Sequence, residues 1–495
     1  MRMIYLDLDT LRPDHLGCYG YPRNTSPNID RMASEGIRFE RCYTSDAPCL
    51  PSRAALMTGR FGIHNGVINH GGTGADRCVD GPGRGFRDSM AGGGSLINVL
   101  RDAGLHTCYI GGFGERHSAY WFYAGFHEVH DTAMGGLESA EHVTPSALEW
   151  IERNAARDHW YLHINYWDPH TPYRAPEGFG NPFENEPLPA WLTEEVRKAH
   201  WTMPGPHSAQ DIAMYDNRTA PAFPRHPGDL PDMQAVRKMI DGYDCGIRYM
   251  DDHLGRLFAA LEAQGVMQDT VVIISSDHGE NMGELGIYGE HGTADQATCR
   301  IPLIVRWPGQ TRAGGVDHGL HYNLDLLPTL AEILKRPGKP HWDGKSYAAT
   351  LLTGADTGRD QLVLSQCCHV CQRAVRWADW MYIRTYHDGF HLFPREQLYN
   401  VVGDPHEQHN LAPERPDLCR EGAWRLMNWH DQMMATLPRG QVTDPMRVVL
   451  DEGGPFHARG HLRRYVERLK VTGRGDAVDE LVRRHPEEFS DAPAG

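Results

Sequence analysis

Short runs of apolar residues alternate with segments of helical periodicity along most of this chain, up to about residue 365. The apolar runs lie at residues 3–8, 107–111, 160–166, 271–275 and 303–306, and the helical segments at 26–36, 143–156 and 239–264. Because the apolar runs are continuous rather than alternating, we expect strands of a parallel sheet that is covered on both faces. The pattern therefore predicts an α/β fold, with a large, mostly parallel sheet flanked by helices.

The pattern changes at two later points. Residues 174–231 are rich in Pro, Asn and Gly with little periodicity, which indicates a long insertion that shapes a pocket. From about residue 362 the apolar runs are shorter, at 374–377, 381–386 and 396–401, and a helix is expected over 416–437. We therefore expect a catalytic domain over 1–365, a C-terminal α+β subdomain over 366–440 with a small antiparallel sheet and a helix, and a tail over 441–495.

The tail carries charged sequence interrupted by Pro and Gly, with one further helix expected over 478–484. Such a segment either wraps a neighbouring subunit, as the oligomerisation arm of a homo-oligomer, or frays at the end of the chain.

Composition narrows the class of partner. A formal charge of −16 over 495 residues argues against a nucleic-acid or anionic-membrane partner, although a local basic pocket remains compatible with it. No apolar run reaches the ~18 residues needed to span a bilayer, and the first strand pattern begins near the initiator without a secretory leader. The 11 cysteines are irregularly spaced, unlike a disulfide framework. We expect a cytoplasmic protein with free thiols and a small-molecule partner.

Acidic residues and one histidine follow two of the predicted strands. Asp9 comes after the first strand, and Asp277 and His278 come after the run at 271–275. The carboxyl ends of parallel strands meet at the edge of a sheet where ligands bind. Oxygen donors with one imidazole suit a divalent cation such as Ca²⁺, Mg²⁺ or Mn²⁺. Taken singly, Asp9 equally fits a helix cap, and Asp277-His278 equally fits a turn.

Residues 49–53, Cys-Leu-Pro-Ser-Arg, open a helix-like run that continues to residue 60. Taken alone, Cys49 also fits a small buried hydrophobe before a turn, because Pro is common in the first turn of a helix. The pentapeptide resembles the C-x-P-S-R signature of the type I, formylglycine-dependent sulfatases. These belong to the alkaline phosphatase superfamily and are related to the phosphonate monoester hydrolases.

Ordered matches to that family extend over nearly the whole chain. Residues 9–20 and 276–280 are similar to its two metal motifs, 168–172 to its aspartate-proline-histidine loop, and 397–412 to its C-terminal signature; 26–30, 36–39 and 300–309 match intervening segments. The resemblance implies an alkaline phosphatase-like sandwich, with the smaller antiparallel sheet at its C-terminal end.

The resemblance further implies hydrolysis of a sulfate monoester by a hydrated aldehyde. A formylglycine-generating enzyme would convert Cys49 to formylglycine. Asp9, Asp277, His278 and residue 49 would hold one divalent metal ion, with Ca²⁺ preferred and Mn²⁺ or Mg²⁺ as alternatives. Thr10 stands where many relatives have a second aspartate.

The same resemblance assigns further side chains to the sulfate site. Arg53 would stabilise the nucleophile and the anionic group electrostatically. His117 would accept the proton that lets the hemiacetal collapse, and His170 would contact the ester oxygen or help to protonate the leaving group. Asn69 is a weaker candidate for the substrate pocket.

Two glutamates stand where relatives commonly carry lysines. Glu115 lies in Gly-Glu-Arg-His at 114–117, and Glu290 lies in Gly-Glu-His at 289–291. Four explanations fit: a shifted alignment in which Arg116 or Arg300 supplies the charge, recognition of a cationic substituent of the substrate, a further metal bound together with His291, or lost catalysis. The resemblance places Glu115, Glu290 and His291 on the substrate-binding side of the site.

Charge also ranks the reactions. Sulfate monoesters, phosphonate monoesters and phosphodiesters each present one negative charge, whereas a phosphate monoester presents nearly two at neutral pH. A pocket without both lysines therefore disfavours the phosphate monoester. We expect a sulfatase, with a phosphonate monoester or phosphodiester hydrolase as the alternative. An inactive relative that only binds an anion fits less well, because Cys49, Arg53 and the metal-type residues are all retained.

Overall fold

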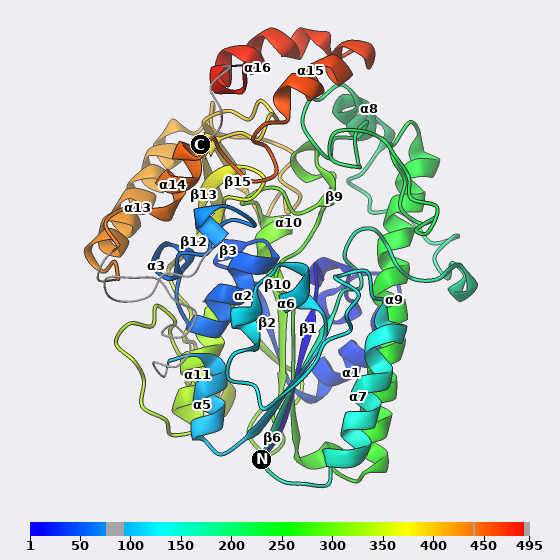
Figure 1. The fold of residues 1–495 in the computed structure, drawn as a ribbon, viewed down its shortest axis with the longest axis vertical. Coiled ribbons are helices and arrows are strands. Elements are labelled where there is room, and N and C mark those ends of the chain that lie inside the picture. Colours follow the sequence, from blue (N-terminus) through cyan, green and yellow to red (C-terminus); the bar gives the residue numbers. More distant parts are fainter. Residues whose placement is uncertain (76–93, 439–440, 490–495) are drawn as a thin grey trace.

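The computed structural model describes residues 1–75, 94–438 and 441–489 of the chain (Figure 1). Within these residues, eight strands form a large sheet in the order β11-β2-β10-β7-β1-β6-β4-β5. They are β1 (Arg2–Leu8), β2 (Ile37–Tyr43), β4 (His106–Ile110), β5 (Glu128–His130), β6 (Trp160–Tyr166), β7 (Thr270–Ser275), β10 (Arg300–Arg306) and β11 (Gly315–Tyr322). Every neighbouring pair of strands is parallel except the two pairs that include β10. The predicted mostly parallel sheet is confirmed.

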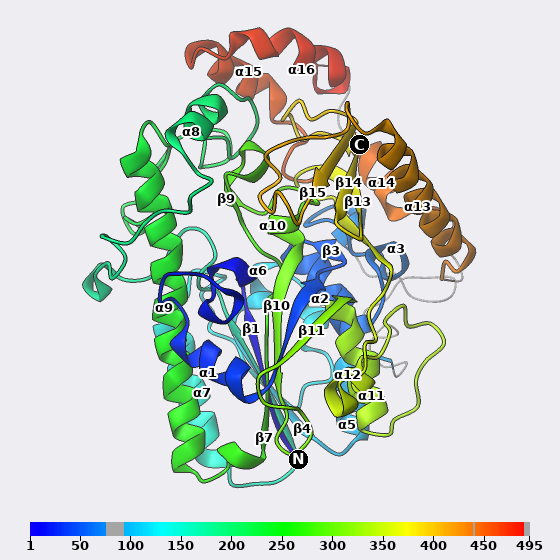
Figure 2. The same ribbon diagram turned by 180° about the vertical axis from the view of Figure 1, so that it is seen from behind.

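Helices cover both faces of this sheet (Figures 1 and 2). One layer contains α1 (Pro27–Glu35), α7 (Ala140–Asn154) and α9 (Met233–Ala263), and the other contains α2 (Cys49–Thr58), α5 (Leu96–Asp102), α11 (Leu326–Ile333) and α12 (Ala348–Thr353). Side chains of β1 alternate between the two hydrophobic cores, with Ile4 and Leu6 in the first and Met3 and Tyr5 in the second. Both faces are therefore buried, which explains why the strand reads as a continuous apolar run.

β10 differs from its neighbours because it runs antiparallel to both β7 and β2. Between β7 and β10 the chain forms only short elements: β8 (Asn281–Met282), β9 (Tyr288–Glu290) and α10 (Gln296–Cys299). A parallel return requires a long crossover, usually a helix that spans the sheet. Without one, the chain re-enters the sheet from the edge at which it left, and β10 runs the opposite way.

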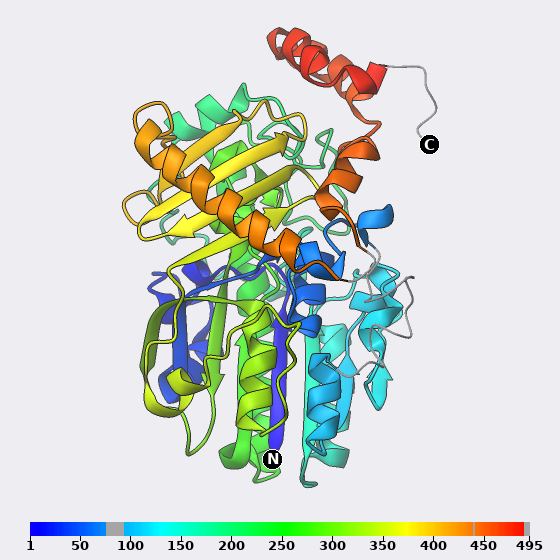
Figure 3. The same ribbon diagram turned by 90° about the vertical axis from the view of Figure 1, so that its left-hand side faces the viewer.

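A smaller sheet packs beyond the carboxyl edge of the large one (Figure 3). It contains β12 (Gln361–Gln366), β13 (Cys371–Trp377), β14 (Trp380–His387) and β15 (Glu396–Asn400), which pair antiparallel, and α13 (Pro416–Ala435) lies across it. β3 (Asp46–Ala47) joins this sheet by pairing with β12. Because β3 ends just before Cys49, the pairing ties the start of α2 to the smaller sheet.

The insertion at 174–231 contains α8 (Glu194–Trp201) and is otherwise mostly irregular. The tail forms α14 (Pro445–Asp451), α15 (Leu462–Val471) and α16 (Val478–Arg484), and it packs on the insertion of its own chain. The Tyr465 hydroxyl donates to the Gly205 carbonyl oxygen at 2.8 Å, and Arg468 pairs with Asp211 at 2.9 Å. Nowhere in the described ranges is there a helix both long and apolar enough to cross a membrane.

Candidate functional site

The predicted metal and nucleophile residues converge at the carboxyl edge of the large sheet. Asp9 follows β1, Asp277 and His278 follow the neighbouring strand β7, and Cys49 is the first residue of α2. All four are buried, and one ligand atom from each lies within 4.8 Å of the others. The sheet therefore brings together residues that are more than two hundred positions apart in the chain.

The start of α2 is held in place by hydrogen bonds from polar neighbours. The Ser52 hydroxyl donates to the Asp277 carbonyl oxygen at 2.7 Å, and the Asn323 amide donates to the Ser52 hydroxyl oxygen at 3.0 Å. The helix ends where Gly59 adopts φ 64°, a left-handed conformation that favours glycine. These contacts fix the position of residue 49 relative to the loop after β7.

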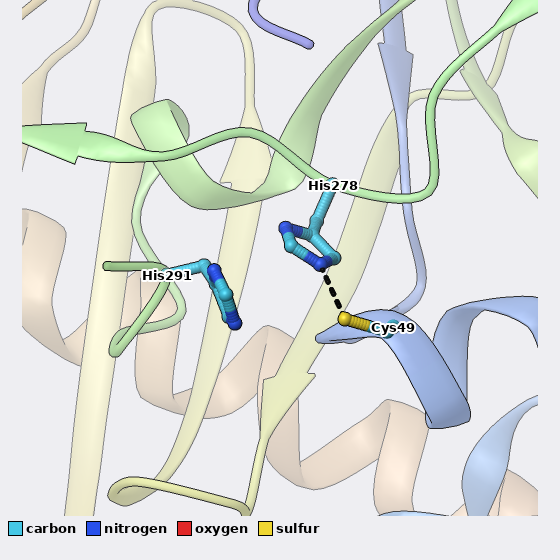
Figure 4. A group of neighbouring side chains, drawn as sticks. All are labelled: Cys49, His278 and His291. Atoms are coloured by element: carbon cyan, nitrogen blue, oxygen red, sulfur yellow. Dashed lines mark hydrogen bonds between the residues drawn. The ribbon is translucent and has the colours of Figure 1, made fainter. Parts of the chain in front are cut away.

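Cys49 is a protonated thiol in this environment. Burial, with further contributions from Asp9 and Asp277, raises the pKa of the thiol well above its ordinary value, although Arg53 opposes the shift. Its Sγ–H donates to Nε2 of His278 at 3.1 Å, and Figure 4 shows the His278 ring directed at the sulfur with His291 nearby. A nucleophilic cysteine acts as the thiolate. The surroundings therefore disfavour Cys49 as a nucleophile in its unmodified form.

Arg53 lies one turn further along α2, among three carboxylates. Its Nε and Nη2 donate to the two oxygens of Asp7 at 2.8 and 2.9 Å, Nη1 donates to Asp277 at 2.5 Å, and Nη2 lies 3.1 Å from Asp9. Its guanidinium also stacks on the Phe113 ring, 4.5 Å from the centroid. With all groups ionised, this buried set carries a formal charge of −2.

The three carboxylates titrate differently. Burial raises the pKa of Asp7, but Arg53 and His163 outweigh burial and hold that pKa at about 2. For Asp9, burial and the charge of Asp277 raise the pKa well above its ordinary value. Burial also raises the pKa of Asp277, against the opposing effect of Arg53. The single guanidinium of Arg53 therefore does not neutralise the negative charge of both Asp9 and Asp277.

The donor set fits a divalent cation. Both carboxylate oxygens of Asp9 and the hydroxyl of Thr10 are buried without a hydrogen-bond partner. Nδ1 of His278 donates to the Gly279 carbonyl oxygen at 2.8 Å, so the Nε2 lone pair of the neutral ring faces the Asp277 carboxylate at 3.2 Å. A metal ion would replace the thiol proton at Nε2 and offset the charge of the carboxylate, and metal-bound histidines commonly donate their second N–H to a carbonyl in this way.

The two predicted catalytic histidines both pack against Trp167. His117 ends α6 (Phe113–Arg116), its Nε2 is buried without a hydrogen-bond partner, and its ring stacks with Trp167 at 6.3 Å. His170 packs edge-on against Trp167 at 5.5 Å, and its Nε2 lies 4.0 Å from Asp9. Burial lowers the pKa of both imidazoles well below the ordinary value, so both are neutral at pH 7.

Two predicted pocket residues make contacts with the backbone. Oδ1 of Asn69 accepts hydrogen bonds from the backbone N–H groups of His70 and Phe456, while its Nδ2 is buried and unpartnered. The carboxylate of Glu115 accepts from the Gly135 backbone N–H at 3.1 Å. The structure therefore places Glu115 against the 131–137 loop, whereas the Asn69 amide remains able to donate.

Glu290 and His291 lie next to the metal-type residues. Oε1 of Glu290 is 2.8 Å from Nε2 of His291, and the His291 ring centroid is 4.1 Å from that of His278. Of the two arginines considered as substitutes for lysine, Arg116 is exposed and Arg300 donates to the Glu40 carbonyl oxygen at 2.9 Å. Neither arginine takes the place of Glu290 in this group.

Several residues near the site carried no usable signal in the sequence. Asp7 points from β1 into the site, although it reads as part of an apolar run. Arg174 donates to the His170 carbonyl oxygen at 2.6 Å. In the sequence, only its position four residues after His170 connects it with the site. His207 from the insertion and His369 from the smaller sheet both approach Glu290. They come from segments whose positions only the tertiary structure determines.

Comparisons with known proteins identify the family of the chain. Residues 2–335 match the family model described as sulfatase. The multifunctional alkaline phosphatase superfamily protein PehA of Trinickia caryophylli is 26% identical over 481 residues, covering 82% of this chain and 89% of that protein.

Two solved structures share the fold. A protein in complex with its substrate D-glucosamine-2-N,6-O-disulfate superposes with a TM-score of 0.69 at 20% identity, covering 88% of this chain and 99% of that one. The phosphonate monoester hydrolase of Agrobacterium radiobacter gives a TM-score of 0.69 at 19% identity, with coverages of 87% and 96%. The chain belongs to the sulfatase family of the alkaline phosphatase superfamily, and it is a hydrolase acting on sulfate esters.

Proposed function

We propose that the chain is a metal-dependent sulfatase that hydrolyses a sulfate monoester with a formylglycine made from Cys49. One observation carries the proposal: a buried cysteine begins α2 within hydrogen-bond distance of His278, beside the carboxylates of Asp9 and Asp277. A thiol in this acidic setting is a poor nucleophile. A hydrated aldehyde at the same position has hydroxyl groups that a divalent cation and Arg53 can activate.

The metal would be held by Asp9, Asp277, His278 and residue 49. The formal charge of −2 on Arg53 and its three carboxylates suits one divalent ion, and mixed oxygen and imidazole donors suit Ca²⁺, Mn²⁺ or Mg²⁺. Ca²⁺ is our first choice because the oxygen donors, two carboxylates and the hydrated aldehyde at residue 49, outnumber the single imidazole. When bound, such an ion supplies positive charge beside the attacking hydroxyl and the sulfate oxygens.

The protein's own side chains have distinct tasks in this proposal. Arg53 is oriented by two hydrogen bonds to Asp7, so its charge is preorganised toward residue 49. His117 is neutral, with an unpartnered Nε2, and can accept a proton from the hydrated aldehyde. His170 is neutral as well, and its Nδ1 donates to the Thr171 carbonyl oxygen, so Nε2 carries a lone pair; it can contact the ester oxygen or protonate the leaving group once Nε2 has taken up a proton. The amide of Asn69 can donate to the sulfate.

The substrate is a small-molecule sulfate ester, and the second candidate reaction is hydrolysis of a phosphonate monoester or phosphodiester. These esters carry the same single negative charge, and a relative of 26% identity is described as multifunctional. Recognition of a cationic substituent on the substrate is one proposal for Glu290, but both of its carboxylate oxygens already face imidazoles, which favours a metal-binding role. The proposed nucleophile also implies one transient partner, a formylglycine-generating enzyme that modifies Cys49. We propose that the chain folds, and meets this enzyme, in the cytoplasm.

Two experiments test the proposal. Peptide mass spectrometry on protein from a host with the maturing enzyme should show the loss of the Cys49 thiol and the gain of an aldehyde. Turnover of an aryl sulfate should then exceed that of a matched aryl phosphonate monoester, and Cys49→Ala should abolish both. Full turnover by Cys49→Ala would overturn the nucleophile, whereas a preference for the phosphonate would favour the second reaction.

A further inference from the structure

Glu290 is the centre of a buried group of histidines that no step of the proposed reaction uses. His207 comes from the insertion, His369 from the loop between β12 and β13, and Glu290 and His291 from the end of β9. In Figures 1 and 2, β9 lies between α8 and the smaller sheet, where these three parts of the chain meet. The exposed fractions are 7% for Glu290, 6% for His207, 4% for His369 and 3% for His291.

The distances within this group resemble those of a metal site. Nε2 of His207 lies 3.2 Å from Oε2 of Glu290, and Nε2 of His369 lies 3.8 Å from Oε1. Ligand atoms of these three residues are all within 4.8 Å of one another. Donor atoms of a tetrahedral zinc site stand about 3.3 Å apart, given metal–ligand distances of about 2.0–2.2 Å. Only small side-chain adjustments separate the observed arrangement from such a site.

The hydrogen bond made by His207 identifies which of its nitrogens carries the proton. Nδ1 lies 2.9 Å from the Ile212 carbonyl oxygen, which can only accept, so Nδ1 is the donor. In the neutral ring the lone pair of Nε2 then faces a carboxylate oxygen of Glu290, and Nε2 is buried without a hydrogen bond. His278 shows the same arrangement toward Asp277 in the first metal set. Two facing acceptors need a cation, either a second proton or a metal ion.

We propose that His207, Glu290 and His369 bind a second divalent ion, of the zinc type, adjacent to the first metal set. Two or three imidazoles with one carboxylate are the donors that zinc and other first-row transition metals prefer, whereas Ca²⁺ and Mg²⁺ prefer oxygen. His291 lies beside the set and orients the same carboxylate, since its Nε2 is 2.8 Å from Oε1 of Glu290. The ion would place positive charge at Glu290, where the resemblance to the sulfatases implies a lysine.

The contacts of Glu290 favour a metal over a substrate cation. Its Oε1 already receives the His291 backbone N–H at 3.0 Å and the His291 ring at 2.8 Å, and Oε2 faces His207. A protonated amine would have to compete with imidazoles for both oxygens. A metal ion instead uses these imidazoles as ligands. The proposal does not depend on the reaction, because its test is metal binding.

The test uses full-length Cys49→Ala protein, which removes the thiol that could hold zinc together with His278 and His291. Calorimetric titration with Zn²⁺ alone, in excess Ca²⁺ to occupy the first set, should show one tight equivalent. Glu290→Gln and His207→Gln should each weaken it by at least about a hundredfold, because even the loss of an outer-shell partner costs about 10–100-fold. His200→Gln is the matched control: it removes a buried imidazole that bonds to the Tyr288 hydroxyl instead. That control should leave the zinc affinity unchanged.

Two further measurements make the outcome decisive. Adding Asp277→Ala should leave the zinc equivalent in place, and X-ray absorption at the zinc edge should report imidazole ligands. His369→Gln replaces Glu290→Gln if circular dichroism shows that the glutamate variant is unfolded. Absence of a zinc equivalent would overturn the proposal. Zinc lost with Asp277→Ala but retained by the folded Glu290 and His207 variants would also overturn it.

Discussion

Replacing Asp9 with Asn should stabilise the metal-free protein while weakening its response to metal. Asp9 is fully buried, neither carboxylate oxygen has a hydrogen-bond partner, and burial with the charge of Asp277 raises its pKa. Asn keeps the shape but removes one of the three charges around Arg53. The guanidinium retains both hydrogen bonds to Asp7 and the one to Asp277.

The expected magnitudes have opposite signs with and without metal. Removing an uncompensated functional charge typically stabilises a protein by about 0.5–2 kcal/mol. Metal at a hundredfold excess over its Kd stabilises the wild type by about 2.7 kcal/mol, which the variant largely loses. If the 495 residues unfold together, the unfolding entropy is about 1 kcal/mol per kelvin, so these energies correspond to Tm shifts of only about 1–3 °C. Denaturant midpoints resolve such differences better than melting curves.

The advantage of the variant should depend on pH. A carboxyl group whose folded pKa is raised stabilises fully below its unfolded pKa, and that contribution is lost as the pH rises through the folded value. In chelator, the difference in unfolding free energy between Asp9→Asn and the wild type should therefore be largest near neutral pH. It should disappear in acid, where Asp9 of the wild type is protonated. The relevant window begins at the ordinary value of 3.8 and extends upward.

Guanidinium titrations of both proteins, in chelator and in excess Ca²⁺, give the measurement. The stability curves should cross: the variant is more stable without metal, and the wild type is more stable with it. Asp251→Asn is the control, because Asp251 is a buried carboxyl with a pKa raised by burial to about 7 on α9, and its substitution should not alter the metal response. A variant that is less stable in chelator yet gains as much from Ca²⁺ as the wild type would refute the reasoning.

Three further outcomes follow from the same geometry. Asp277→Ala removes a charge and a ligand together, so turnover should fall by several orders of magnitude while circular dichroism shows an intact fold; unchanged activity after both this substitution and chelation would mean that the metal set is misassigned. Arg53→Lys keeps the charge but loses the two-pronged contact with Asp7, and kcat should fall by about 10²–10³-fold, as for the loss of an oriented donor, with little change in KM. Glu290→Lys should lower kcat/KM equally for a cationic and a neutral aryl sulfate if Glu290 binds metal; a loss confined to the cationic ester would instead show that Glu290 recognises the substrate.

Local sequence determined much of the fold and the central residues of the site. Continuous apolar runs predict buried parallel strands because both faces of β1 and its neighbours are covered, and the carboxyl ends of such strands meet at one edge. This reasoning places Asp9 and Asp277 together without any structure. The pentapeptide at 49–53 adds a helix start with a cysteine, and its resemblance to the sulfatases supplies the chemistry.

Tertiary structure alone decided what surrounds those residues. Asp7 reads as one polar position in an apolar strand, and only the packing of α2 on the sheet brings Arg53 to it. The antiparallel direction of β10 follows from the absence of a crossover helix, which apolar periodicity does not report. His207 lies in the insertion and His369 in the loop between β12 and β13, so their approach to Glu290 depends on how distant segments pack. Sequence patterns encode burial and local conformation, whereas contacts between distant segments arise only when the layers assemble.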